Sequence, residues 1–328
     1  MSFFAAASPT ETPQPDNSGR LADRTFLVTT QRGNGIARYF GSGSLDGDAT
    51  ATRALIIVHG VLRDADYYFD TGREAIAAAH EEHVLLLAPQ FVEQADIAGQ
   101  HADPQTLYWN GKWPGGSDAT APAPISTYDV FDAMLARLAD RSRFPALREV
   151  VVAGHSAGGQ IVQRYAVVGK AAQLDPASTL PIRLVVSNPS SYFYFDDWRP
   201  VAQRGCSDEN QWRYGLAGAP RYVSGTASEL EARYVERHVI YLLGTADTNP
   251  KEEDLDQSCG GEAQGPYRFA RGKNYIAYLR RRHPKATRQD FAFVDGVGHE
   301  NRRMFTSPCG LWALFGSSAP PCKDKGSV

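Results

Sequence analysis

The sequence predicts an α/β fold built on an open, mostly parallel sheet with helices on both faces. Short, continuously apolar runs recur along the chain, and such runs indicate strands that are buried on both faces. Helical segments separate these runs, which is the alternation that connects parallel strands. One run, 150–153, ends in Gly154-x-Ser156-x-Gly158 and leads directly into a helical segment, as a strand–turn–helix unit requires.

The expected elements follow in order along the chain. Residues 25–30 and 37–40 flank Gly33 and Gly35, which predicts an antiparallel hairpin whose glycines supply positive φ in the turn. The apolar runs then predict strands at 54–58, 84–88, 150–153, 184–186, 239–243 and 291–294. Helices are expected near 72–81, 126–141, 157–169, 267–283 and 300–315. Ser126 is expected to be the N-cap of the second of these helices.

Breaks in this alternation predict the domain organisation. Residues 1–22 are rich in proline and polar residues and are expected to form a disordered arm. Residues 23–187 and 237–317 are expected to form the α/β core, and 318–328 a C-terminal tail. Residues 188–236 form a long insertion that is dense in aromatic residues. Long segments of this kind are usually lids or binding loops, so we expect a cap over the carboxyl edge of the sheet.

Composition and charge exclude several classes of function. The chain carries 34 Lys and Arg against 37 Asp and Glu, so no nucleic-acid partner is expected. No apolar run approaches the roughly 18 residues of a membrane span. Gly33 and Gly35 do not open a dinucleotide-binding turn, because Arg38 stands where a third glycine is needed. His80 and His83 lack the spacing of a zinc-binding pair, so we expect neither a cofactor nor a metal.

The four cysteines lie in stretches rich in Gly, Ser and Pro, which favours two disulfides. Three pairings are possible, and we favour Cys206 with Cys259 and Cys309 with Cys322. Disulfides are typical of an oxidising compartment, whereas residues 1–5 lack the pattern of an export signal. The sequence therefore does not decide the compartment. Export, by a leader absent from this chain, is slightly favoured over a cytoplasmic location.

The glycine-flanked turn predicts that Ser156 is a nucleophile. The glycines on either side are expected because strand and helix approach too closely there for a Cβ, and the serine is expected to be strained. A serine needs a base, and in such sheets the order along the chain is serine, acid, histidine. His299 is favoured because it lies in a glycine-rich loop directly after the last strand. His238 opens a strand, and His283 ends a basic helix.

The acid is expected at the end of a strand between Ser156 and His299. Asp247 meets this condition, because it closely follows the apolar run 239–243. Asp295 is too near His299 on the same segment to reach the imidazole easily. Asp247 would fix the imidazole tautomer and stabilise the imidazolium without taking the proton.

Acyl transfer also needs two N–H donors for the tetrahedral oxyanion. One is expected from Ala157, which follows the nucleophile. The other is expected from Val61, because Gly60 lets the loop after the strand 54–58 bend toward the site. We expect His59 to brace this loop through hydrogen bonds.

Two long segments, 92–125 and 188–236, are expected to border the cleft. Some of their aromatic side chains should pack on the sheet and others should face the substrate. The expected substrate contacts are Trp109, Tyr192, Tyr194, Trp198 and Trp212. The expected partner is a small-molecule ester or amide, and the sequence carries no signature of an oligomeric state.

The features that carry a family resemblance are His59-Gly60, the turn from Gly154 to Gly158, Asp247 and His299. Their order and strand-end placement resemble the α/β-hydrolase fold superfamily across residues 25–316. The stretches 158–166 and 264–272 are similar to a largely uncharacterised bacterial and fungal subgroup, which implies no substrate. The resemblance implies a carboxylesterase that works through a Ser–His–Asp triad, an acyl-enzyme and a backbone oxyanion hole.

Two alternatives stay open beside the esterase. An amidase or peptidase would use the same triad. A non-catalytic binding module on the same fold is more remote, because such modules usually lose a triad member. The loop after His59 lacks the Gly-Gly-Gly of lipases, so bulky tertiary esters are not expected as substrates.

Overall fold

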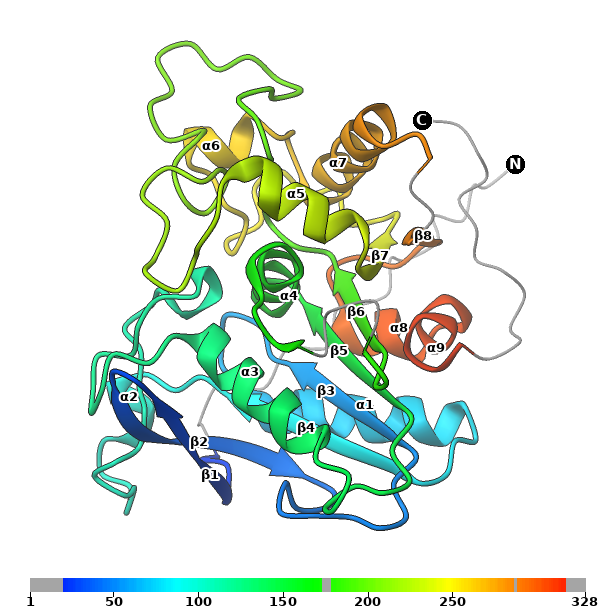
Figure 1. The fold of residues 1–328 in the computed structure, drawn as a ribbon. Helices are drawn as coiled ribbons and strands as arrows, with labels where there is room; N and C mark the ends of the chain where they lie inside the picture. Colours follow the sequence, from blue (N-terminus) through cyan, green and yellow to red (C-terminus); the bar gives the residue numbers. More distant parts are fainter. Residues whose placement is uncertain (1–19, 173–177, 286–287, 317–328) are drawn as a thin grey trace, which may run out of the picture.

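The computed structural model describes residues 20–172, 178–285 and 288–316. Within them, eight strands form one sheet in the order β1-β2-β4-β3-β5-β6-β7-β8 (Figure 1). The strands are β1 (Arg24–Thr30), β2 (Gly33–Gly41), β3 (Arg53–Val58), β4 (Val84–Gln90), β5 (Glu149–His155), β6 (Ile182–Ser187), β7 (His238–Gly244) and β8 (Gln289–Val294). The pairs β1/β2 and β2/β4 are antiparallel, and the other neighbouring pairs are parallel. The predicted hairpin and parallel strands are confirmed.

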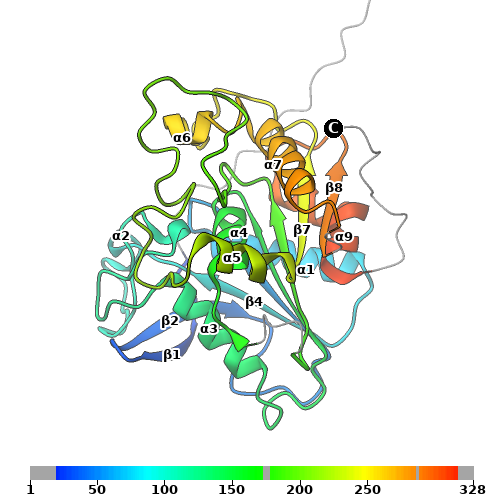
Figure 2. The ribbon, with the colours of Figure 1, turned by 45° about the horizontal axis from the view of Figure 1, so that its top comes forward.

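Helices cover both faces of this sheet (Figures 1 and 2). One face carries α3 (Thr127–Leu138), α4 (Ala157–Val168), α5 (Ala227–Val235) and α7 (Arg268–Arg282). The other carries α1 (Ala65–Ala78), α8 (Asn301–Thr306) and α9 (Pro308–Phe315). Shorter helices in the connections are α2 (Gln94–Ile97), the 3₁₀ helix η1 (Trp113–Gly115) and α6 (Cys259–Glu262). Alternate strand residues supply the two cores, so Ile56 packs with the first group and Leu55 with the second.

Helix boundaries follow local signals, some of which the sequence analysis missed. The helix expected at 300–315 is divided into α8 and α9, because Pro308 lacks an N–H and opens a new helix. The helix expected near 72–81 begins earlier, at Ala65. Ser126 caps α3 as predicted, with its side chain accepting from a backbone N–H of the first turn.

The expected insertion at 188–236 is mostly irregular up to α5, and it is packed through aromatic side chains. Tyr192 stacks on Tyr275 of α7, with ring centroids 4.6 Å apart. Tyr194 lies against Tyr278 of the same helix at 4.7 Å. These contacts hold the segment to α7, and a cap over the serine stays a prediction.

A disulfide between Cys206 and Cys259, with Cα atoms 5.6 Å apart, joins this segment to α6. This predicted pairing is confirmed. Cys309 is also disulfide-bonded. Cys322, which was predicted as its partner, lies outside the described residues.

The predicted terminal segments fall largely outside the described residues, which leave out 1–19 and 317–328. The end of the predicted N-terminal arm is nevertheless held on the sheet. Ala22 is fully buried, and its N–H donates to Gln90 Oε1 at 2.8 Å. In the described part of the chain, none of the helices combines the length and the hydropathy needed to cross a bilayer.

A single buried cation connects α4 to two long loops. Arg164 is fully buried, and it donates from Nη1 to the carbonyl of Pro114 at 3.0 Å and from Nε to that of Arg213 at 3.2 Å. Its Nη2 donates to Gln160 Oε1 at 3.1 Å and to Ser191 Oγ at 3.0 Å. The guanidinium therefore holds the loop of η1 and the segment after β6 on one helix.

We predict that Arg164→Lys lowers the free energy of unfolding by at least about 2 kcal/mol, measured by urea denaturation. One ammonium cannot reach the carbonyls of Pro114 and Arg213 together, and a buried carbonyl without a donor is costly. Arg148→Lys, at an exposed position, is the matched control. A loss no larger than that of the control would contradict the role given to Arg164.

Candidate active site

The turn at the end of β5 is enforced by close backbone contacts. A Cβ at Gly154 would lie 2.2 Å from the carbonyl oxygen of Gly158, and one at Gly158 would lie 2.3 Å from that of Val58. Ser156 has φ 58° and ψ −122°, a backbone conformation that residues other than glycine rarely adopt. The glycine requirement and the strained serine are thus confirmed. The N–H of Ser156 donates to the carbonyl of Ser187 at 3.0 Å, which ties the turn to β6.

The predicted base and acid meet at the same edge of the sheet as the serine. Asp247 follows β7 and His299 follows β8. His299 Nδ1 lies 2.8 Å from Asp247 Oδ2. His299 and Ser156 line one small cleft. Side chains from the ends of β5, β7 and β8 are thereby brought together.

Asn188, which the sequence analysis missed, holds the acid in place. It directly follows β6 and has φ 42°. Its Nδ2 donates to Asp247 Oδ2 at 2.9 Å and to the carbonyl of Gly298 at 3.2 Å. Its Oδ1 accepts from the N–H of Gly244 at 2.9 Å. Its position at the end of a parallel strand was a usable signal, because functional side chains gather at that edge.

Arg268 is a second residue beside the predicted acid that the sequence analysis missed. It is 1% exposed at the start of α7, and its Nη1 lies 3.7 Å from Asp247 Oδ1. Its Nε donates to Ser190 Oγ at 3.2 Å. A cation in this position favours the charged form of the acid. Nothing in the sequence distinguishes it from the other arginines of α7.

The electrostatics of the cleft keep His299 neutral. Burial, and after it the charge of Arg268, hold the pKa of His299 well below its usual value. Burial also holds the pKa of His155 well below its usual value, and the two rings lie 4.4 Å apart. For Asp247, burial raises the pKa and Arg268 opposes the rise. A neutral His299 with Nδ1–H toward Asp247 leaves Nε2 able to accept a proton.

The loop after β3 borders the cleft beside the serine. Val61 lines the cleft together with Ser156, and Ala157 is the first residue of α4. Among the contacts of the described residues, neither N–H donates a hydrogen bond within the protein. Both remain candidates for the predicted oxyanion donors.

His59 braces this loop as expected. Its Nδ1 donates to the carbonyl of Gly60 at 2.8 Å, and its Nε2 accepts from the N–H of Phe91 at 3.0 Å. Its ring also lies 4.5 Å from the ring of Trp113 in η1. Burial lowers the pKa of His59 to about 4, so the ring stays neutral and both hydrogen bonds persist at neutral pH.

The five aromatic residues expected to contact substrate do not line this cleft. Trp109, Tyr192 and Tyr194 are almost fully buried in the core. The indole N–H of Trp212 donates to a carbonyl of η1 at 2.6 Å, and Trp198 stacks on a tyrosine of α7. The rings pack the loops onto the helices, because burying large apolar surfaces there is favourable. The cleft itself has a volume of only about 20 Å³.

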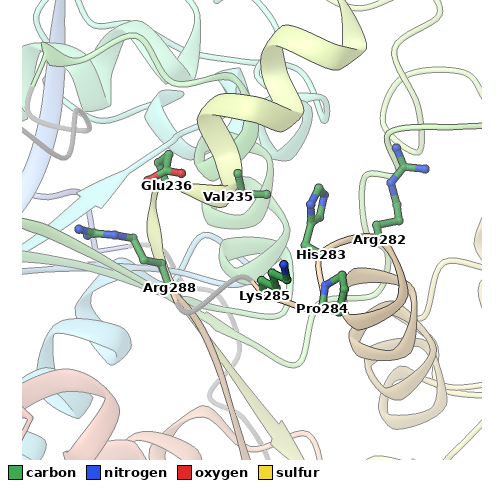
Figure 3. Close-up of a pocket in the computed structure, with 7 residues that line it drawn as sticks. All are labelled: Val235, Glu236, Arg282, His283, Pro284, Lys285 and Arg288. Carbon is green, nitrogen blue, oxygen red and sulfur yellow. The ribbon is translucent and has the colours of Figure 1, made fainter.

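A larger cavity, of about 400 Å³, lies where α5 and α7 end and β7 and β8 begin (Figure 3). Two of its side chains, Arg282 and His283, already bind Glu231 at 2.6 and 2.7 Å. Ser156 follows the carboxyl end of β5, whereas this cavity is at the amino ends of parallel strands. It therefore contributes nothing to the chemistry at the serine.

No family model and no curated protein matches the chain. Solved structures do match it. One is LpqC, a poly(3-hydroxybutyrate) depolymerase from Bordetella parapertussis, at 21% identity over 88% of this chain and 86% of that chain, with a TM-score of 0.59. Another is poly(aspartic acid) hydrolase-1 from Sphingomonas sp. KT-1, at 23% identity over 86% of this chain and 95% of that chain, with a TM-score of 0.57. Identities this low show a shared fold.

We predict that Arg268→Gln raises the pKa of His299, because a positive charge that opposes protonation of the imidazole is removed. NMR titration of the imidazole measures this change. Arg268→Lys keeps the charge and should leave the pKa closer to that of the unmodified protein. If the pKa of His299 changed equally in the two variants, or in neither, the charge of Arg268 would not be what lowers it.

Proposed function

We propose that this chain, which has the α/β-hydrolase fold, is a serine hydrolase that cleaves carboxylic esters through an acyl-enzyme. The observation that carries the proposal is the 2.8 Å contact between His299 Nδ1 and Asp247 Oδ2, beside the cleft of Ser156. A glycine-rich turn with an idle serine would not need an imidazole and a carboxylate from two other strands. The neutral state of His299 supports its role as base.

In the acylation step, Ser156 Oγ attacks the ester carbonyl carbon and its proton passes to His299 Nε2. The carbonyl electron pair moves to the oxygen, and the N–H groups of Val61 and Ala157 stabilise the resulting oxyanion. Asp247 stabilises the imidazolium. When the tetrahedral intermediate collapses, the alcohol leaves with the proton from His299, and the acyl group stays on Ser156.

Deacylation repeats these events with water as the nucleophile. His299 takes a proton from water as the oxygen attacks the acyl carbon, and the same N–H groups hold the second oxyanion. Collapse breaks the bond to Ser156 Oγ, which regains its proton from His299. The carboxylic acid leaves, and the free enzyme is restored.

The small cleft narrows the substrate class. A volume of about 20 Å³ holds little more than one water molecule. Only the reacting carbonyl group fits such a space, and an aromatic acyl group does not. The remainder of the substrate would lie over the open rim beside Val61, which is 38% exposed.

We predict that a fluorophosphonate probe labels the protein and that Ser156→Ala abolishes the labelling. Loss of the nucleophile should lower ester hydrolysis on the order of 10⁴-fold or more. Ser142→Ala, at an exposed position away from the cleft, is the matched control and should be labelled normally. Equal labelling of Ser156→Ala would refute the proposal.

An ester and an amide with the same acyl group separate the two hydrolytic activities. We expect kcat/KM for p-nitrophenyl acetate to exceed that for p-nitroacetanilide by several orders of magnitude. An alkoxide or phenoxide needs less proton donation on departure than an amine does. Comparable values for the two substrates would favour an amidase or peptidase that uses the same Ser156.

A further inference from the structure

The cleft that holds Ser156 is lined by two carboxylates that the proposed chemistry does not use, Asp64 and Asp254. Its two histidines, His155 and His299, have a pKa held well below the usual value by burial, so they add no positive charge at neutral pH. No lysine or arginine is among the described residues that line it. A carbonyl compound that enters this cleft therefore meets negative charge beside the nucleophile.

Asp64 is the less expected of the two, because it is largely buried and the charge of Arg63 opposes the effect of burial on its carboxylate only in part. The residue is 7% exposed and precedes α1, yet its side chain makes no capping hydrogen bond. Among the described contacts, no other residue donates a hydrogen bond to this carboxylate or forms an ion pair with it. Burial raises the pKa of Asp64 to about 6. A largely buried carboxylate that no side chain neutralises by direct contact is costly, which favours a functional role.

The cations nearest to these carboxylates are already bound to other acids. Arg63 directs its guanidinium to Asp96 at 2.6 Å and to Glu93 at 3.3 Å. Arg268 interacts with Asp254 only through its long-range field, and its closest carboxylate oxygen belongs to the acid of the triad, at 3.7 Å.

Asp254 occupies the exposed side of the same cleft. It lies in the loop that follows β7, and its carbonyl accepts from Ser190 Oγ at 3.1 Å, which fixes the loop over the end of β6. Its side chain is exposed. Asp64 and Asp254 thus supply one buried and one exposed carboxylate to a single small space.

We propose that the substrate carries a primary ammonium group close to the reacting carbonyl and that Asp64 and Asp254 bind it. A primary ammonium is smaller than a guanidinium or a quaternary ammonium and therefore suits a narrow cleft better. An ammonium has three N–H donors, which is enough for more than one carboxylate. This inference rests on the proposed ester hydrolysis and adds its substrate class, short esters that bear an amine.

The test compares two esters of the same alcohol, the 3-aminopropanoyl ester and the butanoyl ester, in which CH₃ replaces NH₃⁺. We expect the unmodified protein to favour the cationic ester in kcat/KM by about tenfold or more, the value of a charge-assisted hydrogen bond. Asp64→Asn and Asp254→Asn should each remove most of that preference. Added salt should weaken the preference for the cationic ester. The contribution of the exposed Asp254 should fall more than that of the buried Asp64.

Asp70→Asn, a charge change on α1 at a side chain that is 57% exposed, is the matched control and should leave the ratio of the two esters unchanged. This inference would be overturned if both esters were hydrolysed with nearly equal kcat/KM, or if neither cleft variant changed the ratio of the two kcat/KM values. The proposed function would still stand in either case. Failure to hydrolyse either ester, together with absence of fluorophosphonate labelling, would overturn both.

Discussion

The geometry of the site depends on one close backbone contact, between the turn after β5 and the end of β3. A Cβ at Gly158 would lie 2.3 Å from the carbonyl oxygen of Val58, so α4 can approach β3 only where a glycine stands. Val58 leads directly into the loop that carries Val61. The contact at Gly158 therefore also brings the start of α4 beside that loop. The proposed nucleophile and oxyanion donors are adjacent because two backbones touch, before any side chain contributes.

The proposed acid–base pair depends on a second layer of polar side chains. Asn188 connects the ends of β6 and β7 with the loop that precedes His299, and Arg268 places a buried charge against Asp247. Burial alone would favour a protonated Asp247, and the arginine opposes that effect. The same arginine also discourages protonation of His299. One cation thereby favours the protonation states that a general base and its orienting acid require.

Aromatic and charged residues have separate tasks in the two long segments. The rings of Tyr192, Tyr194 and Trp109 are buried, and the two tyrosines together with Arg164 hold the loops on α4 and α7. The cleft, in contrast, has a polar lining with Asp64 on its buried side. Substrate recognition at such a surface would rest on charge and on small size, and the aromatic residues would serve to keep the surface rigid.

The sequence by itself determined the strands, the turn at Ser156 and the order of Ser156, Asp247 and His299 along the chain. These follow from local rules, because an uninterrupted apolar run must be buried and a crowded turn must have glycines; the predicted α/β-hydrolase fold is confirmed. Only the tertiary structure decided that Asn188 and Arg268 surround the predicted acid, that Trp109, Tyr192 and Tyr194 lie in the core, and that acidic residues line the cleft. Those properties depend on contacts between side chains from segments that are far apart in the sequence. Neither the periodicity nor the spacing of residues predicts such contacts.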